Sequence, residues 1–213
     1  MEIQIDLRVA ELLASRLCHD LVGPIGAVNN GIELMEDTDF GPSGDALKLA
    51  GRSAQQAASN LQFYRLSYGM AGADFAGDYA ELRDLAVGYL APGKVNLEWT
   101  VRGQPDGAPD GLAKLLLNLV ALAAEMLPRG GKVTVASLNG PVGLETSVIA
   151  EGEGAKLREE TEPALADGVR VEELTPRNVQ GYFTRLVAQR LGSDLMVDTP
   201  AENSLRFSVT LRG

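Results

Sequence analysis

The chain has 213 residues, a formal net charge of −10 and an isoelectric point near 4.6, which argues against binding to nucleic acid or to an anionic membrane surface, since both require clustered basic residues. A single cysteine excludes an internal disulfide, and the sequence shows no Cys/His spacing typical of a metal site. No apolar run reaches the roughly 18 residues of a membrane span, and the N-terminus lacks the basic start of a signal peptide, so we expect a cytoplasmic protein.

The first predicted element is a long helix from Asp6 to Glu36. Its apolar residues follow one another at steps of four and three, the spacing of a helix that packs against other helices. This stripe consists of Ala14, Cys18, Leu21, Ile25, Val28, Ile32 and Met35. Because Cys18 belongs to the stripe, we expect its thiol to be buried rather than reactive. Turn-forming residues over 37–44 end the helix.

The second helix is predicted over 45–68 and carries a matching stripe. Its members are Leu47, Ala50, Ala54, Ala57, Leu61, Tyr64 and Tyr68. Two helices joined by a short loop form an antiparallel hairpin, which is too small to bury enough apolar surface alone. We therefore predict that two copies of the hairpin, residues 1–70, pair about a two-fold axis as a four-helix bundle, so that the protein is a homodimer.

His19, the only histidine of the chain, directly follows the stripe residue Cys18. One residue turns a helix by about 100°, which moves the imidazole off the buried stripe and onto the solvent-exposed flank. Arg16 and Asp20 fall on the same outer side. Gly23, one turn after His19, removes side-chain bulk where a partner protein would approach.

Antiparallel pairing about the 37–44 turn places His19 level with Gln62 on the second helix. We expect Gln62 and its neighbours to form the surface beside the imidazole, where a partner docks. The neighbours are Asn60, Phe63 and Arg65, and the docking set also includes Arg16 and Gly23. An ordinary solvated helix face is the alternative interpretation for Gln62 and Arg65.

Pro24 lies five residues after His19, in the interior of the predicted helix. An interior proline costs a helix about 3 kcal/mol and kinks it, so its presence requires a compensating reason. The run His-Asp-Leu-Val-Gly-Pro over 19–24 resembles the phosphoacceptor box of histidine kinase dimerisation helices, usually His-Glu/Asp-x-x-x-Pro. The resemblance implies that His19 accepts a phosphoryl group, with Asp20 beside it orienting the ring or holding its proton.

A second domain is predicted over 74–213, after a glycine-rich linker at 69–73. Helices and strands alternate along it, which favours an α+β sandwich with helices packed on one face of a sheet. The predicted helices cover 79–90, 111–127 and 176–190, and the predicted strands cover 95–101, 132–138, 144–150, 195–198 and 205–211. Thr175 followed by Pro176 is the expected N-cap and start of the last helix.

The second domain resembles the ATP-binding domain of histidine kinases but lacks residues that contact nucleotide. Asn118 matches the first asparagine of the helix that holds metal and phosphates, whereas Leu122 stands where a second asparagine is expected. Ala150 replaces the acid that reads adenine, and Glu151 is one position off. No glycine occurs in 169–180, the expected lid. We predict a kinase-like scaffold that has no ATP and no metal of its own.

These features together resemble the ChpT family of histidine phosphotransferases, and the resemblance extends over nearly the whole chain. It implies that His19 takes phosphate from the receiver domain of a hybrid histidine kinase and passes it to response regulators, with Mg²⁺ supplied by the receiver. Two other interpretations stay open. One is a divergent histidine kinase core that still binds ATP, and the other is a non-catalytic dimeric adaptor or phosphatase of response regulators.

Overall fold

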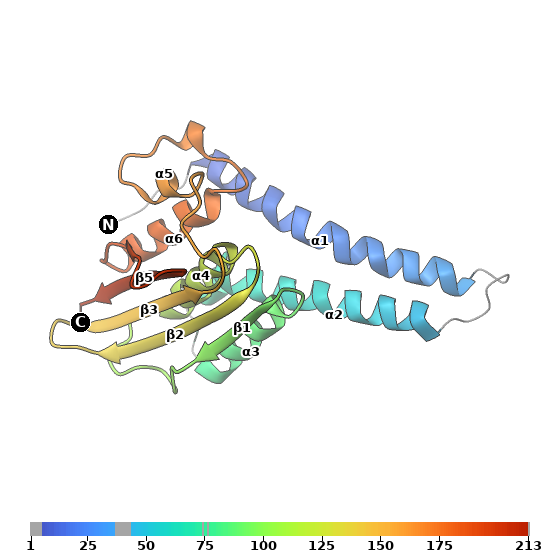
Figure 1. Ribbon diagram of the computed structural model, residues 1–213, viewed down its shortest axis with the longest axis horizontal. Helices are drawn as coiled ribbons and strands as arrows, with labels where there is room; N and C mark the ends of the chain where they lie inside the picture. Colours follow the sequence, from blue (N-terminus) through green and yellow to red (C-terminus); the bar gives the residue numbers. More distant parts are fainter. Residues whose placement is uncertain (1–5, 37–43, 74, 76, 213) are drawn as a thin grey trace.

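Two long antiparallel helices extend from an α/β domain (Figure 1). The computed structural model describes residues 6–36, 44–73, 75 and 77–212. Helix α1 spans Leu7–Glu36 and α2 spans Gly44–Ser67, which confirms both predicted helices to within one residue. Of the turn predicted at 37–44, only Gly44 is described, and it begins α2.

The two helices of the hairpin approach each other closely at small residues. A Cβ added to Gly31 of α1 would lie 2.9 Å from the Cβ of Ala50 and 3.0 Å from the carbonyl oxygen of Ala46 on α2. All three residues are buried. A larger side chain at position 31 would push the helices apart, because packed interiors leave little room for an extra methyl group.

The predicted stripe of α1 is divided between a buried and an exposed part. Leu21 is buried, with 8% exposure, whereas Ile25 and Ile32 are 48% and 42% exposed. Cys18 is also exposed, so the prediction of a buried thiol is wrong for the single chain. On α2, Leu61 is 49% exposed. The stripe is wider than the contact between the two helices, so one edge of it stays open to solvent.

A five-stranded sheet forms the centre of the second domain. Its order is β1-β2-β3-β5-β4, with β1 parallel to β2 and the other neighbours antiparallel. The strands are β1 Val95–Trp99, β2 Gly131–Asn139, β3 Leu144–Glu151, β4 Met196–Asp198 and β5 Ser204–Leu211. All five predicted strands are confirmed, and no bound differs from the prediction by more than two residues.

Three helices cover one face of this sheet (Figure 1). They are α3 Tyr79–Leu90, α4 Leu112–Glu125 and α6 Val179–Arg190. Residues of β2 and β3 alternate between buried and less buried positions, as expected of strands with one face toward a core. The arrangement agrees with the predicted sandwich of helices on one side of a sheet.

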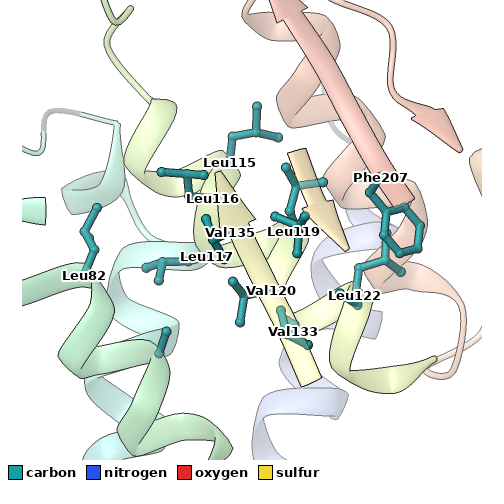
Figure 2. Close-up of a cluster of buried hydrophobic side chains, with 14 of the residues drawn as sticks. Leu82, Leu115, Leu116, Leu117, Leu119, Val120, Leu122, Val133, Val135 and Phe207 are labelled. Atoms are coloured by element: carbon teal, nitrogen blue, oxygen red, sulfur yellow. The ribbon is translucent and has the colours of Figure 1, made fainter. Parts of the chain in front are cut away.

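Helix α4 is apolar on all sides and lies at the centre of the core. Every residue from Leu115 to Ala123 is buried, and Figure 2 shows its leucines beside Val133 and Val135 of β2 and Phe207 of β5. A helix with this pattern needs neighbours all round. The sheet covers one side, and α2, α3 and α6 cover the others. The same core includes three residues from the C-terminal half of α2, namely Phe63, Tyr64 and Leu66.

Asn118, a fully buried polar residue of α4, joins three helices. Its Nδ2 donates to the carbonyl oxygen of Ser67 at the end of α2 (2.7 Å), and its Oδ1 accepts from Gln180 of α6 (3.0 Å). Lys114, one turn earlier, donates to the carbonyl oxygens at 68 and 69, both at 3.0 Å. The predicted linker therefore begins as a segment fixed to α4, and the domain boundary between residues 70 and 74 stays a prediction.

The segment before α6 differs from the prediction. Helix α6 begins at Val179 instead of Pro176, because Oδ1 of Asn178 accepts a hydrogen bond from the backbone N–H of Thr175 (2.7 Å) and closes a turn. Thr175 is therefore a turn residue and not the N-cap. Three short helices that were not predicted are η1 Met70–Gly72, α5 Glu162–Leu165 and η2 Val171–Glu173.

Candidate functional site

His19 projects from α1 into solvent. Its side chain is 88% exposed, which confirms the predicted position on the flank of the helix. The ring nitrogen Nδ1 lies 3.2 Å from Oδ1 of Asp20. A carboxylate only accepts hydrogen bonds. A neutral imidazole that donates to Asp20 through this contact therefore has its proton on Nδ1 and its lone pair on Nε2. An imidazole held in this way offers Nε2 as a nucleophile.

Asp20 is held from the opposite helix of the hairpin. Its Oδ2 accepts a hydrogen bond from the hydroxyl of Tyr64 on α2 (2.5 Å), and its backbone carbonyl oxygen accepts one from Nδ2 of Asn60 (3.2 Å). Gln56 donates in turn to Oδ1 of Asn60 (2.7 Å). Residues four apart lie on the same face of a helix. One face of α2 therefore fixes both the backbone and the side chain of the residue beside His19.

Aromatic rings surround Tyr64 and hold its hydroxyl in place. The ring stacks on Tyr68 with centroids 5.1 Å apart and meets Tyr89 of α3 edge-on at 5.8 Å. Phe63 stacks on Tyr89 at 4.0 Å. Burial raises the pKa of Tyr64, and Tyr89 and the hydrogen bond to Asp20 raise it further. The hydroxyl therefore stays protonated at neutral pH and keeps donating to Asp20.

The prediction that Arg16 lies on an open surface is wrong. Its guanidinium forms an ion pair with Glu125 at the end of α4, and the two side chains are only 13% and 14% exposed. Burial acts to lower the pKa of Arg16, but Glu125 and smaller contributions outweigh it, so the net shift is upward. Burial raises the pKa of Glu125 against the opposing effect of Arg16. Arg16 therefore links α1 to the second domain. This domain covers the side of α1 that was predicted to be exposed.

Two more of the predicted docking residues lie in contrasting surroundings. Gly23 is exposed, and no described atom outside its own turn of helix lies within 4 Å of an added Cβ, so it leaves open space beside His19 as predicted. Phe63 is fully buried and is not a docking residue. Its side chain belongs to the core because α3 packs on that side of α2.

The last two predicted docking residues, Gln62 and Arg65, are exposed but line a hollow of about 800 Å³ toward α3. The side chains of α2 that reach the turn around His19 are Asn60 and Tyr64. Of the residues predicted beside the imidazole, Asn60 therefore reaches this turn. Gln62 and Arg65 lie on another face of α2, because alignment by residue number ignores helical phase. Tyr64 belongs to the predicted apolar stripe, and its hydroxyl, four residues from Asn60, is the sequence signal for its polar role.

A groove of about 920 Å³ opens next to Asp20. Its walls come from α1, α2, the loop after α3 and the C-terminal end of α4. Charged and aromatic side chains line it, among them Arg16, Asp20, Tyr64, Tyr89, Lys94 and Glu125. The groove is a concave surface beside the exposed imidazole, with groups that suit contact with another protein.

The residues that the sequence analysis compared with the nucleotide contacts of histidine kinases pack or pair within this protein. Leu122 and Ala150 are fully buried in the core. Asn118 is engaged by α2 and α6, as described above. Glu151 forms an exposed ion pair with Lys132 on the neighbouring strand (3.1 Å).

The segment 169–180, which the sequence comparison with histidine kinases matched to their lid and which is called the lid-like segment below, packs against the first turn of α1. Nε of Arg8 donates to the carbonyl oxygen of Val171, and its Nη2 donates to that of Leu174, both at 3.2 Å. Val9 is fully buried in a small apolar cluster with Leu174 and Val179. The start of the hairpin therefore holds this segment in place.

Comparison with known proteins assigns the family. The family model described as "Histidine phosphotransferase C-terminal domain" matches residues 79–203. Protein phosphotransferase ChpT of Brucella abortus (strain 2308) is 30% identical over 198 residues, which cover 92% of this chain and 93% of the relative. The chain belongs to the ChpT-type histidine phosphotransferase family. The resemblance drawn from the sequence is thereby confirmed.

The phosphotransferase fold extends over the whole chain. A solved structure described as a bacterial phosphotransferase matches it with a TM-score of 0.79 and 29% identity, over 98% of each chain. No helix among the described residues is long and apolar enough to cross a membrane. Within the same residues, no three His, Cys, Asp or Glu side chains are grouped so that they would hold a metal ion.

Four tyrosines, three of them around the site, predict a loss of stability at alkaline pH. Burial raises the pKa of Tyr64, Tyr68 and Tyr89, and it raises the pKa of Tyr79 to about 12. Unfolding returns each to a pKa of about 10, so the folded phosphotransferase holds these protons more tightly. Its free energy of unfolding therefore has its full value below about pH 10. Above that pH it decreases by about 1.4 kcal/mol per pH unit for each tyrosine.

Denaturant unfolding on either side of that pH, together with the ultraviolet absorbance of tyrosinate, checks this prediction. Tyrosinate absorbance should rise together with unfolding. Tyrosines that all ionise in the folded protein at their ordinary pKa, with no loss of stability, would contradict it.

Proposed function

We propose that this phosphotransferase carries phosphate between receiver-domain aspartates in a phosphorelay, through phosphohistidine at His19 and without ATP. The observation that supports this most is the position of His19, whose side chain is 88% exposed and whose Nδ1 is turned toward Asp20. An imidazole so exposed is accessible to the active site of another protein. Because the chain has one histidine, phosphohistidine has one possible location.

In the first step, the Nε2 lone pair of His19 attacks the phosphorus of an aspartyl phosphate on a docked receiver. The P–O bond to the receiver aspartate breaks, and its carboxylate leaves with the bonding electrons. The Nδ1 proton remains in its hydrogen bond to Asp20, whose negative charge offsets the positive charge that the ring gains. A second receiver aspartate then attacks the same phosphorus and releases neutral His19. Such a transfer needs chiefly positioning, and Mg²⁺ belongs to the receiver.

Three features of the second domain support transfer without ATP and without autokinase activity. Leu122 and Ala150 are buried apolar residues at positions where the resembled kinases use polar groups. Asn118 is already engaged in hydrogen bonds between helices. The lid-like segment is attached to Arg8 of α1. We propose that the domain needs no cofactor and serves to cover α1 and to shape the groove beside Asp20.

The proposed partners are the receiver domain of a hybrid histidine kinase, which delivers phosphate, and response regulators, which receive it. The open position at Gly23 and the groove beside Asp20 form the proposed docking surface. We further propose a cytoplasmic homodimer. The exposed halves of the two stripes, which include Ile25, Ile32 and Leu61, would then contact a second hairpin.

His19→Gln should abolish transfer and leave the fold intact. Glutamine keeps a polar side chain of similar length at an exposed site, so the free energy of unfolding should change by less than about 0.5 kcal/mol. The assay supplies a radiolabelled, phosphorylated receiver, then a second receiver, and follows the label on each chain. Asp20→Asn is the graded comparison, and it should slow transfer without abolishing it, because Asp20 orients the nucleophile but forms no bond to phosphorus.

Label that reaches the second receiver at the native rate through the glutamine variant would contradict the proposed mechanism. Release of inorganic phosphate from the first receiver, with no label on the unmodified protein, would identify a phosphatase or an adaptor instead.

ATP with Mg²⁺ at millimolar concentration should leave the melting temperature unchanged. A ligand at a hundred times its dissociation constant adds about 2.7 kcal/mol to the stability of the native state, which a thermal shift measurement detects. Leu122→Asn combined with Ala150→Asp should not restore binding, because the lid-like segment still lacks glycine and packs on α1. A clear ATP-dependent rise for the unmodified protein would favour a divergent histidine kinase.

Ile25→Asp should dissociate the proposed dimer without unfolding the chain. Ile25 is 48% exposed in the single chain, so only a second copy would bury the new charge. Val87→Asp on α3 is the matched control, because Val87 is also 48% exposed but lies outside both stripes. Leu21 is unsuitable because it is buried within one chain. Light scattering measures the mass, and a native monomer at micromolar concentration would refute the dimer.

A further inference from the structure

We infer that Tyr64 is a positioning residue of the His19 site, which holds Asp20 in the rotamer that fixes the proton of the imidazole on Nδ1. The effect on transfer rate rests on the proposed function. The effect on the tautomer does not, because the position of the proton is a property of the resting protein.

The carboxylate of Asp20 is shared between two groups. Oδ1 faces Nδ1 of His19 at 3.2 Å, and Oδ2 accepts the Tyr64 hydroxyl at 2.5 Å. The contact with Tyr64 is the shorter one and comes from a buried donor, so it is the contact that fixes the side chain. Adjacent residues on a helix do not face each other. A free Asp20 would therefore turn toward water, and Tyr64 removes that freedom.

Tyr64 is itself fixed in position. The residue is only 3% exposed, and its ring lies between Tyr68 and Tyr89. One turn earlier on α2, Asn60 holds the backbone of Asp20. The site of attack is thus exposed, while the groups that orient it are buried behind it.

The ion pair between Arg16 and Glu125 prevents a competing ion pair between Arg16 and Asp20. Arg16 lies one turn before Asp20 on α1, at a spacing that lets oppositely charged side chains pair on a helix. Glu125 of α4 holds its guanidinium in a largely covered ion pair instead. The carboxylate of Asp20 is therefore left to His19 and Tyr64.

A defined tautomer matters because only the nitrogen with the lone pair attacks phosphorus. A neutral imidazole without a fixed partner populates both tautomers, and a ring in the wrong one must first exchange its proton. In the proposed transfer, Nε2 of His19 forms the bond to phosphorus, the P–O bond breaks, and the Nδ1 proton stays with Asp20. Loss of the charge-assisted hydrogen bond from Tyr64 should slow this step about tenfold.

The single histidine makes the tautomer directly measurable. NMR spectra of the nitrogen-labelled full chain, at a pH where imidazole is neutral, give the two ring-nitrogen shifts of His19 without overlap from another histidine. The unmodified protein should show the Nδ1–H tautomer in clear excess. Tyr64→Phe, which deletes only the hydroxyl, should move both shifts toward those of free histidine.

Tyr68→Phe is the matched control. Tyr68 stacks on Tyr64, and its hydroxyl donates a bond of similar length, 2.6 Å, to Gln180 instead of Asp20. The variant should keep the tautomer and the transfer rate of the unmodified protein. In an Asp20→Asn background, Tyr64→Phe should not slow transfer further. Equal tautomer shifts in the two phenylalanine variants, or no shift in Tyr64→Phe, would overturn the inference.

The two proposals fail separately. If the unmodified protein accepts no phosphate, the proposed function fails, while the tautomer of His19 still decides the role of Tyr64. If Tyr64→Phe transfers phosphate at the native rate with an unchanged tautomer, the inference fails and the proposed function stands.

A measurement on the hydroxyl proton covers the case in which Tyr64→Phe does not fold. In the unmodified protein, the Tyr64 proton lies between two oxygens 2.5 Å apart and should give a low-field NMR signal that disappears in Asp20→Ala. A signal that persists in that variant would overturn the inference.

Discussion

The burial of α4 on all sides is the constraint on which the rest of the structure depends. A helix whose residues from Leu115 to Ala123 are all buried must be enclosed, and the sheet covers only one side of it. The C-terminal half of α2 covers another side, which joins the hairpin to the second domain and brings Arg16 to Glu125. Polar groups inside this enclosure are paired across helices, as at Asn118, because an unpaired buried group would cost stability.

The site on α1 follows from this enclosure. An exposed imidazole needs no compensation for lost hydration, but exposure alone leaves its orientation and its tautomer undefined. The buried side of the hairpin defines this orientation, because Tyr64 and Asn60 hold Asp20 from α2. Glu125 pairs with Arg16, which therefore does not compete with His19 for the carboxylate of Asp20. The reactive group is thus accessible to a partner, and the groups that orient it are shielded from water, where hydrogen bonds are stronger.

Two fully buried apolar residues, Leu122 and Ala150, help to stabilise the core of the second domain. Full burial of a leucine contributes about 1.5–3 kcal/mol relative to an exposed one, and Leu122 adds this to a core that Ala150 also helps to fill. Contacts of Arg8 and Val9 with the lid-like segment stabilise the same domain from the start of α1. Through these contacts the hairpin and the second domain pack against each other as one unit.

The sequence by itself determined the elements whose signals are local. The bounds of α1, α2, α3 and the strands follow from apolar spacing and turn residues, and the exposure of His19 follows from its place one residue past the stripe. The tertiary structure alone decided that Arg16 is largely covered, that Phe63 is buried and that Tyr64 reaches Asp20. Helical periodicity states which residues share a face, but it does not state what packs on that face. Arg16 packs against the carboxylate of Glu125, which is 109 residues away in the sequence. The two meet only because the hairpin helps to enclose α4.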